Sequence, residues 1–146
     1  MSRVFISEGT GATIYVFTED HCPPHVHARH RGEGWIARVR FSYLSSTVEF
    51  MSIAPTKNVP LQRVVNRLLD NIQDRLSDCR QSWWITKRTA CLTNQWALVP
   101  ANGKVELVSE QRPDAKQIVD ASYDPTTEQL MVSFRDSTTT EVRLRP

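Results

Sequence analysis

The chain lacks any long apolar run. None of its uninterrupted apolar stretches approaches the roughly 18 residues that a membrane-spanning helix needs. Residues 1–9 also lack the apolar core and the small-residue cleavage site of a secretory signal. We therefore expect no membrane partner and a location in the cytoplasm.

Cysteine is scarce, with only three residues: Cys22, Cys79 and Cys91. An odd number without a C-x-x-C pair is typical of reduced thiols rather than of a disulfide framework. Cys22 is also a candidate nucleophile because it follows His21. Neighbours on an extended chain point apart, however, so the sequence disfavours a Cys–His pair here.

Charge of one sign is not dominant either. The formal net charge is +2, and it is spread unevenly. Residues 1–112 carry 14 Lys/Arg against 10 Asp/Glu, whereas residues 113–146 carry 4 against 6. A surplus this small permits a phosphate-rich partner without requiring one.

Histidine is absent outside residues 21–30, where all four lie: His21, His25, His27 and His30. Imidazole titrates near neutral pH and is the commonest metal ligand in proteins. We therefore expect the histidines to act together, with Asp20 beside them. An ordinary solvent-exposed cluster is the alternative.

Two prolines, Pro23 and Pro24, stiffen the middle of this segment. Each fixes its own φ and pushes the preceding residue towards extended geometry. A rigid corner that leads into a strand is expected, and side chains alternate between faces along a strand. One face of that strand then carries four residues: His25, His27, Arg29 and Arg31.

Short apolar or alternating runs predict strands on either side of the corner, at residues 4–6, 12–17, 35–43 and 48–53. Together they predict an antiparallel meander. The polar side of the 35–43 strand carries Arg38 and Arg40. With Arg29 and Arg31 they are expected to form a cationic rim that binds nucleic acid. Further along, Asn102-Gly103 predicts a two-residue hairpin turn.

A single long helix is predicted for residues 61–81. Apolar residues recur there at three- and four-residue steps, and Pro60 suits a position at the start of a helix. One amphipathic helix covering one sheet accounts for such a stripe. The Trp83-Trp84 pair is interpreted as core packing rather than as a stacking platform for bases.

The polar segment 109–116 predicts a linker between a body, residues 1–108, and a C-terminal part, residues 117–146. The C-terminal part has the pattern of three strands, which would be marginally stable alone. We expect it to cover the histidine face, to pair with a second copy in a homodimer, or simply to extend its own sheet. The predicted fold class is α+β: an antiparallel β-meander packed on one long amphipathic helix, with an appended C-terminal three-stranded β-meander.

The run Asp20-His21-Cys22-Pro23-Pro24-His25-Val26-His27 forms a D-H-x-P-P-H-x-H motif. This motif resembles the small bacterial family described as domain of unknown function 4160, and the resemblance covers about residues 3–85. Residues 118–136 are similar to the opening meander of domain of unknown function 2442, with Ser137 where that family has glycine. Neighbouring genes of the two families look like toxin–antitoxin pairs. The resemblance therefore implies a bacterial accessory protein of toxin–antitoxin type, with RNA or a cognate antitoxin-like protein as its partner.

Three kinds of chemistry fit these residues. A divalent transition metal such as zinc could be held by His21, His25 and His27, with Asp20 as a further ligand or orienting group and an open position for water. Metal-free phosphodiester cleavage would instead take its base and acid from four catalytic candidates: Asp20, His21, His25 and His27. The arginines would then stabilise the charge on phosphate. A non-catalytic module would bind nucleic acid or protein through the same basic face.

We expect action on RNA through the histidines, as a ribonuclease-like or metal-dependent hydrolase. A transition-metal-binding protein or a non-catalytic binding module is the alternative.

Overall fold

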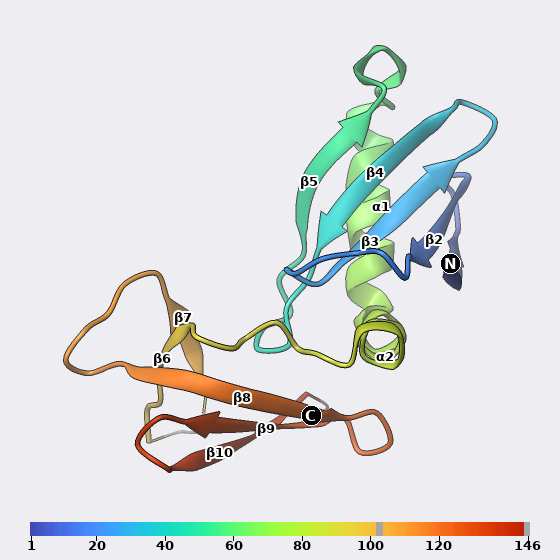
Figure 1. Cartoon of the computed structure of the whole chain (residues 1–146). Helices are drawn as coiled ribbons and strands as arrows, with labels where there is room; N and C mark the ends of the chain where they lie inside the picture. The colour runs from blue at the N-terminus through green and yellow to red at the C-terminus, as the bar shows by residue number, and fades with distance from the viewer. Residues whose placement is uncertain (102–103, 145–146) are drawn as a thin grey trace. The chain divides into compact units, whose positions relative to one another are not determined.

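The chain divides into two compact units (Figure 1), Met1–Arg88 and the residues from Thr89 onward. The computed structural model describes residues 1–101 and 104–144. The division lies between Arg88 and Thr89, rather than at the predicted linker 109–116. Residues 89–108, which the sequence assigned to the body, belong to the second unit.

The first unit contains a five-stranded antiparallel sheet whose strands follow one another in sequence order. Its strands are β1 Ser2–Ser7, β2 Ala12–Val16, β3 His25–His30, β4 Trp35–Arg40 and β5 Glu49–Ala54. A short 3-10 helix, η1 Thr56–Asn58, follows β5. Glycines at positive φ, including Gly9 and Gly34, occupy the turns after β1 and β3.

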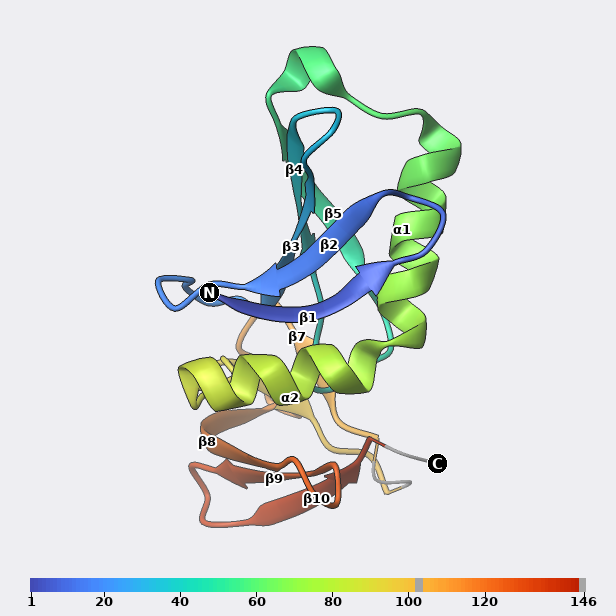
Figure 2. The same cartoon turned by 90° about the vertical axis from the view of Figure 1, so that its right-hand side faces the viewer.

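One face of this sheet forms the core of the first unit. In β4 the side chains of Trp35, Ala37 and Val39 are fully buried, whereas the intervening residues are exposed. This is the alternation that the sequence predicted for residues 35–43. Helix α1, Gln62–Asp74, runs along the sheet (Figure 2) and contributes buried apolar side chains at three- and four-residue steps: Val65, Leu68 and Ile72.

The predicted single helix 61–81 is wrong, because the chain forms two short helices. Helix α1 ends at Asp74, Arg75 has a non-helical backbone (φ −111°, ψ 27°), and helix α2, Leu76–Lys87, follows in another direction. No proline or glycine marks the break. The Arg75 guanidinium makes one tertiary contact, at 4.7 Å from the ring centre of Phe5, and one local ion pair with Asp78, at 2.6 Å.

Helix α2 is held to the segment after β4 by a buried arginine. Arg80 donates through its guanidinium to the carbonyl oxygens of Ser42, at 3.0 Å, and Ser45, at 2.8 Å. Its own carbonyl accepts the hydroxyl of Tyr43. A buried charge is tolerated when its donors are satisfied in this way. These bonds fix the place of α2 at the end of the sheet.

The second unit contains a second five-stranded antiparallel sheet, in the order β10-β9-β8-β6-β7. Its strands are β6 Trp96–Leu98, β7 Glu106–Val108, β8 Lys116–Asp124, β9 Gln129–Phe134 and β10 Thr139–Arg143. Side chains buried in its core include Ile118, Tyr123, Leu130, Val132 and Phe134. The predicted turn at Asn102-Gly103 lies outside the described residues.

The predicted fold class, a meander packed on one long helix, is therefore wrong: the described chain consists mainly of two five-stranded antiparallel sheets, with two short helices in the first unit. The predicted C-terminal three-stranded meander corresponds to β8, β9 and β10. Strands β6 and β7 extend it to five strands, which gives it more partners than three strands alone would have.

The structure bears on two expectations related to cell location, the absence of a membrane-spanning helix and the reduced state of the cysteines. Within residues 1–101 and 104–144, neither helix is long and apolar enough to cross a membrane. Cys79 is a buried free thiol, whereas Cys22 and Cys91 are not free thiols. The expectation of three reduced cysteines is wrong for these two residues, so the cysteines give no support to the predicted cytoplasmic location.

Candidate metal centre

Two of the histidines of β3, His25 and His27, face away from the helix-covered core. His27 pairs across the ladder with Arg38 of β4, and His25 pairs with Arg40. Residues directly opposite each other in an antiparallel pair lie on the same face of the sheet. Since Arg38 and Arg40 occupy the exposed positions of β4, His25 and His27 lie on the outer face, as the alternation predicted.

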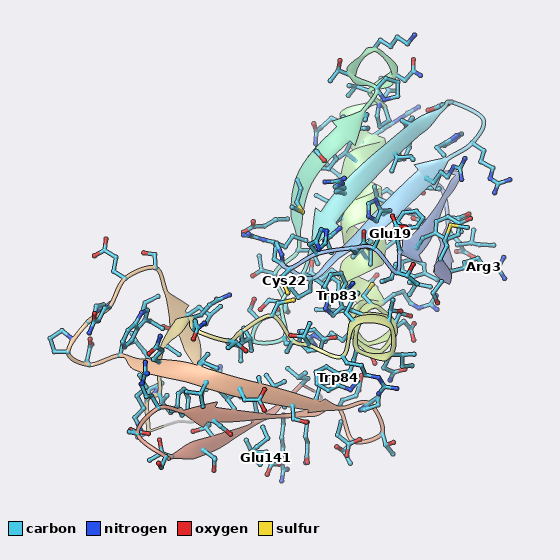
Figure 3. The ribbon with its side chains drawn as sticks, viewed as in Figure 1. Arg3, Glu19, Cys22, Trp83, Trp84 and Glu141 are labelled. Atoms are coloured by element: carbon cyan, nitrogen blue, oxygen red, sulfur yellow. The ribbon has the colours of Figure 1, made fainter. Side chains whose placement is uncertain are left out.

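The loop between β2 and β3 carries Asp20 to the same face. The backbone N–H of Asp20 donates to the carbonyl of Phe17 at 3.1 Å, and the N–H of Phe17 donates to Asp20 Oδ2 at 2.9 Å. Lys87, at the end of α2, donates through Nζ to the carbonyl of Thr18 at 2.9 Å. Figure 3 shows this loop between Glu19 and Cys22, with Trp83 of α2 below it. The loop is thus tied both to itself and to α2.

Asp20, His25 and His27 form one compact cluster. The Oδ1 atom of Asp20 lies 2.9 Å from Nε2 of His27 and 3.4 Å from Nε2 of His25. The exposed fractions of the three residues are 8%, 6% and 6%, respectively. A single carboxylate oxygen therefore faces two imidazole nitrogens in a place largely closed to solvent.

The protonation of His25 is determined by its other ring nitrogen. Nδ1 of His25 lies 2.9 Å from the carbonyl oxygen of Pro23, which can only accept a hydrogen bond. Nδ1 must therefore carry the proton, so the neutral ring presents a lone pair at Nε2. This lone pair faces Asp20 Oδ1, which is also an acceptor. Two acceptors in this position repel each other, and a proton or a metal ion between them relieves this repulsion.

Aromatic side chains surround the two imidazoles. The ring centre of His25 is 5.5 Å from that of Trp83, and the ring of Phe17 meets His27 edge-on at 4.4 Å. The two imidazole centres are 5.0 Å apart. Packing of this kind limits ring rotation and excludes water, which holds the Nε2 atoms toward Asp20.

Burial lowers the pKa of His27 below 6.5. Electrostatic interaction with His25 and Arg38 lowers it further, while the hydrogen bond and the charge of Asp20 act in the opposite direction. His27 is therefore mainly neutral at pH 7, which is the form of imidazole that binds a metal.

The donor set fits a transition metal. One ligand atom from each residue lies within 4.8 Å of the others. Tetrahedral zinc with bonds of about 2.0–2.1 Å needs ligand atoms about 3.3 Å apart, close to the distances of 2.9 and 3.4 Å that Asp20 Oδ1 makes with the two histidines. Three protein ligands leave a fourth position for water or substrate, as in catalytic zinc sites.

The other two histidines do not join this cluster. His21, predicted as a catalytic residue and metal ligand, is exposed, and Asp20 occupies the place expected for it. His30 accepts the N–H of Glu33 at its Nδ1, and a Cβ at Gly11 would lie 2.4 Å from its Nε2. His30 is thus packed against the turn before β2, on the opposite face of β3 from His25 and His27.

The four predicted nucleic-acid-binding arginines fall into different settings. Arg38 lies directly across from His27 and has no ion-pair or side-chain hydrogen-bond partner within residues 1–101 and 104–144. Arg29 is half-buried on the same face, whereas Arg31 is exposed in the turn after β3. Arg40 is paired with Glu49 at 2.6 Å.

Three aromatic residues beside the cluster were not predicted to be part of the site. Tyr15 pairs with His27 across the β2–β3 ladder, and Phe17 and Trp83 contact the imidazoles. The alternation of residues 12–17 could have placed Tyr15 and Phe17 on the histidine face. Nothing in the sequence pattern places Trp83 against His25, because that contact depends on the helix break at Arg75.

Comparisons with models of known protein families, with curated proteins and with solved structures gave no match for this chain. The resemblance to domains of unknown function 4160 and 2442 therefore stays a prediction. The same holds for the toxin–antitoxin role, for RNA and an antitoxin-like protein as partners, and for a homodimer formed through the C-terminal strands.

Proposed function

We propose that the first unit binds a divalent transition metal such as zinc through Asp20 Oδ1, His25 Nε2 and His27 Nε2. The observation that supports this proposal most directly is the contact between two hydrogen-bond acceptors, His25 Nε2 and Asp20 Oδ1. The Pro23 carbonyl fixes the lone pair of His25 toward a carboxylate oxygen 3.4 Å away. A metal ion satisfies both groups and His27 at once.

The proposed role is hydrolytic. A metal ion held by three protein ligands lowers the pKa of a bound water to near 7 and so supplies a nucleophile at neutral pH. Asp20 and the two histidines would hold the ion. Phe17 and Trp83 would keep the imidazole rings in place and limit access of bulk water. The Pro23 carbonyl would orient His25 through its second nitrogen, as orienting groups commonly do in metal sites.

A proton is the competing occupant of the cluster. If His25 carried a second proton, its Nε2–H would donate to Asp20 and no metal would be needed. The two alternatives differ at neutral pH, where a metal ion displaces this proton and binds in a fixed ratio.

The direct test is metal analysis of protein purified without a histidine tag and then titrated with zinc by calorimetry. We expect one zinc ion per chain, and loss of that ion in the His25→Ala and His27→Ala variants. His21→Ala is the matched control, because this exposed histidine lies outside the cluster, and it should bind zinc like the wild type. Equal zinc binding by the wild type and the His25→Ala/His27→Ala double variant would overturn the proposal.

A further inference from the structure

We propose that the ligand of this metal site carries a phosphoryl group, and that Arg38 and Arg29 hold its oxygens. The inference rests on the proposed function, since it identifies the chemical class of molecule that the metal site takes. It concerns the part of the outer face next to the Asp20–His25–His27 cluster.

The ladder register places both arginines beside the cluster. Arg38 is directly across from His27, in a pair type where Cβ atoms lie about 4.5–5.5 Å apart. Arg29 lies two residues beyond His27 on the same strand and the same face. It is the diagonal neighbour of Arg38, a relation in which side chains of this length reach the same volume.

The two arginines are also not neutralised by carboxylates. Other arginines of this protein have acidic partners, including Arg40 with Glu49, Arg75 with Asp78 and Arg112 with Asp114. Among the described residues Arg38 and Arg29 have no such partner. Two like charges on neighbouring positions of one face repel each other, and an anion bound between them relieves this repulsion.

The cross-strand neighbours of His27 and Arg38, on β2 and β5, supply polar and aromatic groups but no competing carboxylate. The β2 neighbour of His27 is Tyr15, and the β5 neighbour of Arg38 is Ser52. The only acidic side chain that reaches the histidines in the described structure is Asp20, which the proposed metal engages. An anion bound at Arg38 would therefore contact hydrogen-bond donors, and no carboxylate, on the exposed part of the outer face.

A phosphoryl group fits this arrangement better than a carboxylate. A guanidinium binds oxyanions through two parallel N–H donors. Two guanidinium groups and a metal ion around one ligand favour a ligand with several oxygens. A phosphate monoester provides three such oxygens, whereas a carboxylate provides two.

The experiment measures zinc and phosphate binding separately on the full chain. The probes are zinc alone, and then inorganic phosphate, adenosine monophosphate and acetate at constant ionic strength, with anion binding followed by calorimetry on zinc-loaded and zinc-free protein. Inorganic phosphate and adenosine monophosphate together distinguish free phosphate from a phosphorylated organic molecule. Acetate tests whether any anion suffices.

The variants are Arg38→Met and Arg29→Met, with Arg31→Met as the matched control, since Arg31 is exposed in the turn beyond the site. We expect Arg38→Met to weaken phosphate binding about tenfold or more, in line with the loss of a charge-assisted hydrogen bond, while zinc still binds in a one-to-one ratio. Arg29→Met should weaken phosphate binding in the same direction, and Arg31→Met should change neither affinity by more than about twofold.

The possible failures are distinguishable. If zinc binds but Arg38→Met binds phosphate like the wild type, the inference is overturned and the metal site stands. If acetate binds as tightly as phosphate, the inference is likewise overturned. If zinc does not bind, the proposed function fails. Phosphate binding to the zinc-free protein that does not depend on Arg38 would then overturn this inference as well.

Discussion

At the residue scale, Asp20 is the group on which the site converges. One of its carboxylate oxygens faces both imidazoles, and the other accepts the N–H of Phe17. The sequence indicated that the histidines would act together, and it placed Asp20 among the candidates. It did not distinguish Asp20 from His21 as the third member, because that choice depends on the turn in which Asp20 and Phe17 bond to each other.

Asp20→Asn should change both zinc binding and the titration of His27. Asn keeps the size of the side chain but removes the charge, so zinc affinity should fall by at least about tenfold. In the metal-free protein the pKa of His27 should fall further below that of the wild type, because Asp20 is the group that raises it. NMR titration of the imidazole measures this directly.

The control for this substitution is Glu19→Gln, which removes an exposed charge from the same loop. It should leave zinc affinity and the pKa of His27 near their wild-type values. An unchanged or raised pKa of His27 in Asp20→Asn would contradict the geometry of the cluster.

The metal-free protein should also lose stability in mild acid through His27. Its pKa in the folded state is below the value of 6.5 expected in the unfolded chain. Between these two values the unfolded chain binds a proton that the folded chain does not, so a fall in pH favours unfolding. The loss begins as the pH falls through 6.5 and is complete below the folded-state pKa. Urea unfolding at pH values from about 5 to 8, the range in which histidine titrates, measures this loss of stability.

His27→Gln should show a smaller fall in unfolding free energy over this range, because glutamine does not titrate. His21→Gln is the matched control: it removes an exposed histidine outside the cluster and should keep the wild-type slope. A His27→Gln variant with the full wild-type slope would show that another group is responsible.

At the element scale, α2 is the part of the first unit that the sequence described least well. Its helical residues continue the apolar steps of α1, so the pattern predicted one helix. Asp78 in the first turn of α2 is the one local signal of a new helix start, since acidic residues favour that position. The break itself coincides with the contact between Arg75 and Phe5, a tertiary contact that the periodicity of the sequence does not indicate.

Trp83→Ala should destabilise the first unit by about 3–5 kcal/mol, the usual cost of removing a large core aromatic. Trp83 is fully buried and contacts both His25 and Phe41. Zinc affinity should fall as well, because the ring of His25 loses its contact with the ring of Trp83. Chemical unfolding and zinc titration of the same sample measure the two effects.

Ile85→Ala serves as the control on the same helix, since Ile85 is 61% exposed. Its effect should stay within about 0.5 kcal/mol, as for most surface substitutions. A Trp83→Ala protein with wild-type stability would mean that α2 does not pack on the sheet as described.

At the scale of the whole molecule, the sequence predicted antiparallel strands better than it predicted their grouping. The alternation in β3 and β4 correctly placed His25, His27 and Arg38 on one face, because that period of two is a local property. The division between Arg88 and Thr89 was missed. Strands β6 and β7 are only three residues each, too short to indicate which sheet they join.

Zinc should stabilise the full chain against unfolding. A ligand that binds only the folded state at 100 times its Kd adds about 2.7 kcal/mol to the free energy of unfolding. The cluster brings together residues from a loop and a strand, so it does not exist in the unfolded chain. Thermal unfolding with zinc and then with excess chelator measures the gain and its reversal. If zinc stabilises the His25→Ala/His27→Ala double variant as much as the wild type, the stabilisation comes from another site.

The most direct measurement is anomalous X-ray diffraction at the zinc edge, on crystals of the untagged protein grown with zinc at neutral pH. The proposed metal centre predicts one strong peak about 2.0–2.2 Å from Asp20 Oδ1, His25 Nε2 and His27 Nε2. Crystals with no peak at the cluster, and with Asp20 Oδ1 still in direct contact with both imidazoles, would contradict it.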